Sequence, residues 1–114
     1  MVDNSKSSAI PAFLVSAYNT AYGKKPNSFA ALGYDSAAIM ISALKAVDDA
    51  HAADETAPAL GATAECRQAI IDAMAATDLD CVTGHITFDE NNNPIKDCTI
   101  IGIENGAYKY IAKY

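Results

Sequence analysis

Apolar residues at helical spacing occupy the first two thirds of the chain. Over residues 9–22 they recur every three or four positions, which predicts an amphipathic helix that Gly23 ends. The same spacing predicts a second helix over residues 34–50 and a third over residues 64–76, with Thr63 as the N-cap of the third. This part of the chain is therefore expected to be helical.

The second predicted helix follows a short apolar run. Residues 28–32 are small and apolar, so we expect a buried strand there, with Gly33 as a tight turn into the helix. Asp35 then falls in the first turn, where its negative charge suits the helix dipole. Two adjacent faces of this helix are apolar, which predicts burial on two sides. The first face comprises Ala37, Met40, Ile41, Leu44 and Val47, and the second comprises Ile39, Ala43 and Ala46.

The last third of the chain changes to short β-type patterns. Residues 85–88 and the β-branched residues 99–103 read as strands, and a connection is expected between the third helix and the first of them. Asn105-Gly106 matches the type I′ turn of a hairpin, with residues 107–111 as its returning strand. Together the patterns predict an α/β fold: three helices with a short strand, then a C-terminal antiparallel β-hairpin.

Length and charge narrow the classes of protein. The 114 residues suffice for one domain, so residues 1–114 are taken as a single domain. The 8 Lys and Arg residues are scattered, and with 14 Asp and Glu residues they give a net charge of −6, which argues against nucleic acid or an anionic membrane surface as a partner. The chain has no run of about 18 uncharged apolar residues and no apolar signal sequence after Met1, so neither a membrane span nor a signal peptide is expected.

The residues that could carry chemistry form no complete set. Cys66, Cys81 and Cys98 lack metal-ligand spacing, and the sequence leaves open whether two of them form a disulfide or all three stay as thiols. His85 lies near Cys81 in sequence, but no orienting group or oxyanion hole accompanies the pair. His51 is expected to be solvated at a helix end. We therefore expect no metal, no cofactor and no enzymatic activity.

Asp89, Asn91 and Asn93 alternate as they do at the start of a calcium-binding loop. Such a loop also needs Gly at its sixth position and Glu at its twelfth. The chain has Pro94 and Ile100 at those positions, so we predict a plain turn.

Aromatic residues supply the remaining signals. Tyr108, Tyr110 and Tyr114 alternate on the last strand, where they could pack against the rest of a larger protein or against a second subunit. Phe29 and Tyr34 flank the end of the predicted strand over residues 28–32. Ligands of open α/β sheets bind at the carboxyl ends of strands, so this segment has the setting of a site.

Four segments taken together resemble one known family. They are residues 13–26 (FLVSAY to YGKKP), 29–37 (FAALGYDSA), 83–91 (TGHITFDEN) and 103–108 (IENGAY). In order and spacing they are similar to the C-terminal third of the substrate-binding proteins of branched-chain amino acid ABC transporters. These are type 1 periplasmic binding proteins, also called the extracellular ligand-binding receptor family. The likeness extends over nearly the whole chain.

The resemblance implies a partial type 1 periplasmic-binding-protein lobe, which would be a C-terminal fragment of a two-lobed ligand-binding protein. By that likeness Phe29 matches an aromatic residue that lines the ligand cleft, and Tyr34 belongs to the Tyr-Asp pair that follows it. Both are candidate ligand contacts. The implied function is the solute-binding component of an ABC importer for amino acids or similar small molecules. Such a protein is periplasmic or extracellular and delivers its ligand to an ABC permease.

Two alternatives remain open from the sequence. The same fold serves as a ligand-sensing receptor domain, and a free-standing dimeric α/β module without a ligand would also fit. An isolated part of the family fold would expose apolar surface that its other parts cover. A homo-oligomer is therefore expected, with domain swapping of strands as one route to it.

Overall fold

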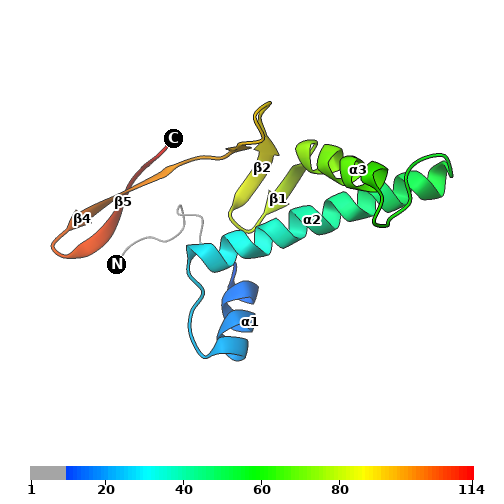
Figure 1. Ribbon diagram of the computed structural model, residues 1–114. Coiled ribbons are helices and arrows are strands. Elements are labelled where there is room, and N and C mark those ends of the chain that lie inside the picture. Colours follow the sequence, from blue (N-terminus) through cyan, green and yellow to red (C-terminus); the bar gives the residue numbers. More distant parts are fainter. Residues whose placement is uncertain (1–9) are drawn as a thin grey trace.

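A computed structural model describes residues 10–114, which form three helices and two small antiparallel sheets (Figure 1). The helices are α1 (Ala12–Tyr22), α2 (Ser28–Ala53) and α3 (Ala64–Ala75). The strands are β1 (Asp78–Cys81), β2 (Gly84–Phe88), β3 (Pro94–Ile95), β4 (Thr99–Glu104) and β5 (Ala107–Lys113). The predicted fold class is confirmed, whereas several predicted boundaries are wrong.

Helix α1 starts later than the apolar spacing predicted. Pro11 is its N-cap, because the fixed ring of proline is tolerated where the helix begins. The predicted start at residue 9 lies outside the described residues. Gly23 ends the helix as predicted: its φ of 68° is left-handed, and its N–H donates to the carbonyl of Asn19 at 2.8 Å.

Helix α2 begins at Ser28, so the predicted strand over residues 28–32 is wrong. Asn27 is the N-cap, and its side-chain oxygen accepts a hydrogen bond from the N–H of Ala30 at 3.0 Å. Gly33, expected to form a turn, lies inside the helix. A short apolar run fits a turn of a buried helix as well as a buried strand. Here the N-cap hydrogen bond of Asn27 favours the helix.

The buried face of α2 agrees only in part with the two predicted faces: Ile39 and Ala43 of the second face and Val47 of the first are buried. Its buried residues recur every four positions and are Ala31, Asp35, Ile39, Ala43 and Val47. The predicted main stripe is largely exposed, since Met40 and Ile41 keep 41% and 65% of their surface. Helix α3 packs against α2, and its cap is as predicted: the hydroxyl of Thr63 accepts from the N–H of the buried Cys66 at 3.1 Å.

The three-stranded sheet has the order β1-β2-β3, with β1 and β3 as its edges. Strand β1 lies in the segment that was expected to be a plain connection. It pairs with β2 so that Leu79 faces Ile86 and Asp80 faces His85. Ile86 is buried, so the sheet turns one side toward the helices (Figure 1).

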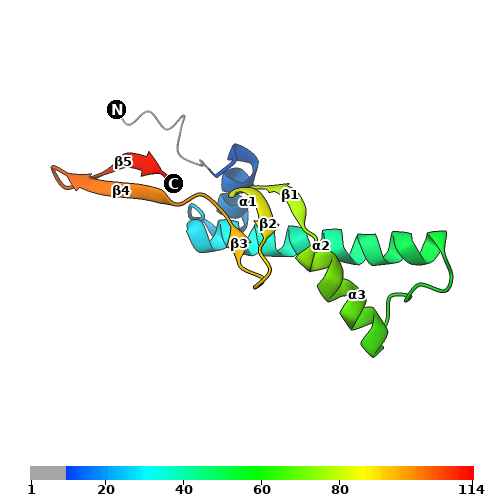
Figure 2. The ribbon, with the colours of Figure 1, turned by 90° about the horizontal axis from the view of Figure 1, so that it is seen from above.

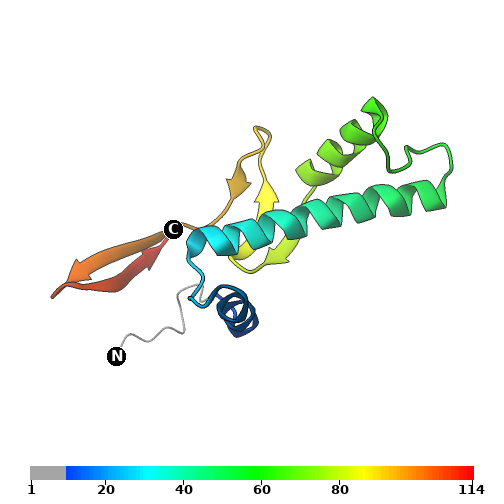
Figure 3. The ribbon, with the colours of Figure 1, turned by 60° about the horizontal axis from the view of Figure 1, so that its bottom comes forward.

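The hairpin β4–β5 turns through Asn105 and Gly106, whose φ angles of 53° and 77° are those of the predicted type I′ turn. Its pairing shifts register between Ile100 and Ile101, where the β5 partner changes from Ala112 to Tyr110. The hairpin extends away from the helices, and its two strands contact mainly each other (Figures 1 and 3).

The molecule is elongated. Its radius of gyration is 18.1 Å and its extents are 61 × 34 × 20 Å, whereas a compact chain of this length would have a radius of gyration of about 13 Å. Figure 2 shows the reason: α2 extends toward one end of the molecule, and the hairpin β4–β5 extends toward the opposite end. Much apolar surface is consequently left uncovered.

Helix α2 is long and apolar enough, by length and composition, to cross a membrane, which the sequence had not led us to expect. Core helices of globular folds meet the same criterion. One face of α2 packs against α3 and β1 and includes the carboxylate of Asp35, and the rest of the helix is largely exposed.

Candidate functional site

The two predicted ligand contacts both lie near the N-terminal end of α2. Phe29 is in the first turn and keeps 79% of its surface exposed. Tyr34 is 45% exposed, and its ring packs edge-to-face against Phe13 of α1, with centroids 5.9 Å apart. Five helical positions separate Phe29 from Tyr34, which places them on different faces of the helix. The structure therefore does not bring the two side chains together.

Tyr34 borders a cavity of about 670 Å³ between α1, α2 and β1. Phe29 is not among the residues that line it. Strand β1, an edge of its sheet, forms one wall, and the wall from α2 includes Ile41 and Lys45. The cavity is apolar with a few polar groups, which is the usual character of a small-molecule site. Its full lining is Pro11, Phe13, Tyr34, Asp35, Ala38, Ile41, Ser42, Lys45, Leu79, Asp80, Cys81 and Val82.

Asp35 is the buried polar residue among those that line this cavity, with 2% of its surface exposed. Its carboxylate accepts hydrogen bonds from the N–H of Val82 at 2.8 Å, from the N–H of Thr83 at 2.9 Å and from the hydroxyl of Thr83 at 2.6 Å. The ammonium of Lys96 in turn donates to that hydroxyl. The expected role of Asp35 at a helix start is wrong: it is the eighth residue of α2 and fastens the β1–β2 turn to the helix.

This role of Asp35 was missed, although the sequence holds a signal for it. Asp35 stands in a series of small or apolar residues at four-residue intervals, from Ala31 to Ile39 and beyond. A carboxylate on a buried helix face needs partners, and backbone N–H groups of a tight turn supply them without a counter-charge. The predicted strand over residues 28–32 hid this periodicity.

Cys81 and His85 do not form a nucleophilic pair. Burial raises the pKa of the Cys81 thiol, and the nearby charge of Asp35 raises it further. A raised pKa leaves less thiolate, the opposite of what a nucleophile needs. The ring nitrogens of His85 instead lie 2.7 Å from a carboxylate oxygen of Asp80 and 2.8 Å from one of Asp78. These carboxylates, Asp80 foremost, raise the pKa of His85.

The other polar candidates are structural. His51 is half-buried rather than solvated, and its Nδ1 lies 2.8 Å from the carbonyl of Ala57, closing the loop after α2. Asp89 accepts from the N–H groups of Asn91 and Asn93, each at 2.8 Å, and these bonds hold the pKa of its carboxyl below the usual value. Within residues 10–114 no cluster of His, Cys, Asp and Glu has the arrangement of a metal site.

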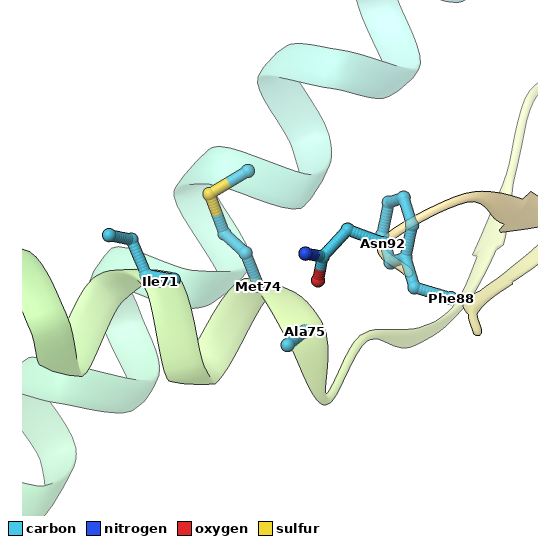
Figure 4. A pocket seen from close by; sticks show the side chains of 5 residues that line it. All are labelled: Ile71, Met74, Ala75, Phe88 and Asn92. Atoms are coloured by element: carbon cyan, nitrogen blue, oxygen red, sulfur yellow. The ribbon is translucent and has the colours of Figure 1, made fainter. Parts of the chain in front are cut away.

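A second, smaller cavity of about 250 Å³ lies between α3 and the end of β2 (Figure 4). Figure 4 shows Met74 and Ile71 on the helix, with Phe88 and Asn92 across the gap. Its volume is below the range of typical ligand sites, and no ionisable side chain lines it. We interpret it as a packing gap between α3 and the turn that follows β2.

The cysteines, whose pairing the sequence left open, are all free thiols in the structure. Cys66 is buried, Cys81 is half-buried and Cys98 is exposed just before β4. The Cys66 sulfur accepts a hydrogen bond from the N–H of Gly61 at 3.3 Å, which joins α3 to the loop before it.

Comparison with known proteins shows the fold. No protein-family model and no curated protein matches the chain. A solved structure does: the leucine-binding protein LivK from Thermotoga maritima MSB8 is similar with a TM-score of 0.65 and 23% sequence identity. The match covers 96% of this chain but only 27% of that protein. The chain thus has the fold of one part of a type 1 periplasmic binding protein.

Proposed function

We propose that this chain is part of a solute-binding protein that captures amino acids or similar small molecules for an ABC importer. The likeness of 96% of the chain to a leucine-binding protein is the observation that supports this role. The chain spans about a quarter of that protein's length, so the intact protein would have two lobes and deliver its ligand to a membrane permease outside the cytoplasm. The role is one of binding, not catalysis.

In this proposal the N-terminal end of α2 contributes to one wall of the ligand cleft. Phe29 offers an exposed aromatic surface there, suited to an apolar side chain of the ligand. Tyr34 has a supporting role, because Phe13 already covers one side of its ring. The ammonium and carboxylate of an amino acid would be held by groups from the rest of the cleft.

A titration followed by NMR tests this function. We expect leucine, isoleucine and valine to shift the amide signals of residues 28–36 in the isotope-labelled chain, and aspartate and lysine to shift them less. Phe29→Ala should abolish the shifts, whereas Met40→Ala, which removes an exposed apolar side chain elsewhere on α2, should leave them. Shifts confined to other residues, or equal responses to charged and apolar amino acids, would argue against the proposal.

A further inference from the structure

The turn of the hairpin β4–β5 holds an asparagine followed by a glycine, Asn105-Gly106. An asparagine in this setting is especially prone to lose its side-chain amide spontaneously, because glycine carries no side chain that would hinder the approach of its backbone nitrogen to the carboxamide. Both residues are exposed, so water reaches them. The turn therefore combines the sequence and the solvent access that this reaction needs.

The backbone nitrogen of Gly106, which would be the nucleophile, is not tied up by the pairing of the strands. Glu104 pairs with Ala107, so the two-residue turn joins the carbonyl of Glu104 to the N–H of Ala107. The N–H of Gly106 lies in the middle of the turn, outside this ladder. No hydrogen bond of the ladder has to break to free that nitrogen.

The other asparagines of residues 10–114 are less suited to the reaction. Asn27 is held as the N-cap of α2. Asn93 precedes Pro94, whose backbone nitrogen carries no hydrogen and cannot form the imide. The others are followed by residues with a side chain, which hinders the attack; they are Asn19, Asn91 and Asn92.

The closed turn opposes the reaction. The five-membered ring would contain the nitrogen of Gly106 and the carbonyl carbon, Cα, Cβ and Cγ of Asn105, so it closes only when that nitrogen turns toward Cβ. The φ of 53° at Asn105 belongs to a type I′ turn, in which ψ is about 30° and the next nitrogen points away from Cβ. The rotation that brings the two groups together therefore breaks the turn.

Little besides its own pairing keeps the hairpin closed within residues 10–114. The strands β4 and β5 contact mainly each other (Figures 1 and 3). A two-stranded hairpin alone is at best marginally stable in water, and such elements open locally at a small cost in free energy. The open hairpin, in which Asn105 and Gly106 are free to rotate, is therefore visited often.

We propose that Asn105 is a site of self-modification, where opening of the hairpin lets the chain convert its own turn asparagine to isoaspartate. The nitrogen of Gly106 gives its proton to water and bonds to Cγ of Asn105. The bond from Cγ to the side-chain nitrogen breaks, and that nitrogen takes up a proton and leaves as ammonia. The product is a cyclic imide.

Water then opens the imide and is the only co-reactant. It adds to one of the two carbonyl carbons, whose bond to the Gly106 nitrogen breaks, and the nitrogen regains a proton. Addition at Cγ gives aspartate with the normal backbone. Addition at the backbone carbonyl gives isoaspartate, in which the chain continues through the former side chain.

Isoaspartate should keep the hairpin from closing again. It lengthens the backbone of the turn by one carbon atom, whereas the pairing of Glu104 with Ala107 needs a two-residue turn of normal length. It also places a new carboxylate next to that of Glu104. The modification thus makes a reversible opening permanent. This inference goes beyond the proposed function and does not depend on it.

Peptide mapping of the whole chain by mass spectrometry, after incubation in mildly alkaline buffer, tests the proposal. We expect the one-dalton gain that follows from exchanging NH₂ for OH to occur at Asn105 before any other asparagine of residues 10–114. Fragmentation should identify isoaspartate there. A free peptide of residues 101–109, which has no hairpin to open, should react faster.

Two matched variants test the dependence on opening. Ile101→Ala weakens the strand pairing and should speed the reaction at Asn105 by up to about fivefold. Ile41→Ala removes a similarly exposed isoleucine from α2 and should leave the rate unchanged. Circular dichroism of both variants checks that the helices are kept.

Three results would overturn the proposal. A gain that comes first at another asparagine of residues 10–114, or none at Asn105 while the free peptide reacts to completion, would show that the turn is not the reactive site. A rate at Asn105 equal to that of the free peptide would show that the closed hairpin does not control the reaction. Equal rates in the wild type and Ile101→Ala, or the same acceleration by Ile41→Ala, would separate the reaction from hairpin opening.

Discussion

At the scale of single residues, Asp35 connects helix α2 to the turn between β1 and β2. It lies on the apolar face of α2 and accepts three hydrogen bonds from Val82 and Thr83. These partners are 47 and 48 positions away in the sequence, so the carboxylate fixes where the β1–β2 turn meets the helix. Residue-level periodicity could have predicted the burial of Asp35, but not the turn that satisfies it.

Replacing Asp35 should therefore loosen the sheet from the helix. Asp35→Asn keeps the size of the side chain but places an amide NH₂ against two backbone donors, so we expect a loss of roughly 2–3 kcal/mol in the free energy of unfolding. Urea denaturation followed by circular dichroism measures it. Asp49→Asn is the control, because it removes only an exposed partner of Lys45, and it should behave like the wild type. Equal effects of the two substitutions would contradict the anchoring role.

His85 is expected to titrate above its ordinary pKa of 6.5, because the carboxylates of Asp80 and Asp78 favour the imidazolium. The stability gained from these contacts is fully present below pH 6.5 and is lost as the pH rises through the raised pKa. An NMR titration of the ring protons should show Asp80→Asn lowering this pKa, and Asp78→Asn lowering it less, since the hydrogen bond to Asp80 is the largest cause. A larger effect of Asp78→Asn would contradict the arrangement.

At the scale of elements, sequence patterns identified three helices and the last hairpin but misplaced the start of α2 and missed β1. The hairpin was predictable because Asn105-Gly106 is a local signal with one preferred turn type. The start of α2 was not predictable in this way, because a Gly after a short apolar run suggests a turn as readily as a helix. Strand β1 has little apolar character, and its position depends on pairing with β2 and on the distant Asp35.

Two glycines give opposite predictions for the same substitution. Gly33 lies within α2, where a Cβ would meet no other atom within 4 Å, so Gly33→Ala should stabilise the chain by about 0.5–1 kcal/mol. Gly106 has a φ of +77°, so Gly106→Ala should destabilise the hairpin by about 1 kcal/mol. Urea denaturation of both variants checks the signs. If Gly33→Ala destabilised the chain instead, the result would favour a turn at Gly33, as the sequence pattern predicted.

At the scale of the whole molecule, the fold is matched along 96% of the chain, yet the match covers only 27% of the similar protein. Phe29 and Tyr34 were predicted from segment likeness, and the structure places both at one end of α2 but on different faces. A cleft between two lobes is a property of the complete fold, and this chain covers 27% of the similar protein. Local sequence patterns can propose residues for such a cleft, but they carry no information on the distant groups that would complete it.

The hairpin and the helices should also differ in stability within one chain. Helix α2 packs against α3 and β1, so amide hydrogens in the middle of α2, such as that of Ala43, should exchange slowly. The strands β4 and β5 contact mainly each other, and two strands alone are only marginally stable, so we expect their amide hydrogens to exchange faster. Hydrogen exchange followed by NMR measures both sets of amides. Protection of β4 and β5 equal to that of the centre of α2 would show that the hairpin is stabilised by more than its own pairing.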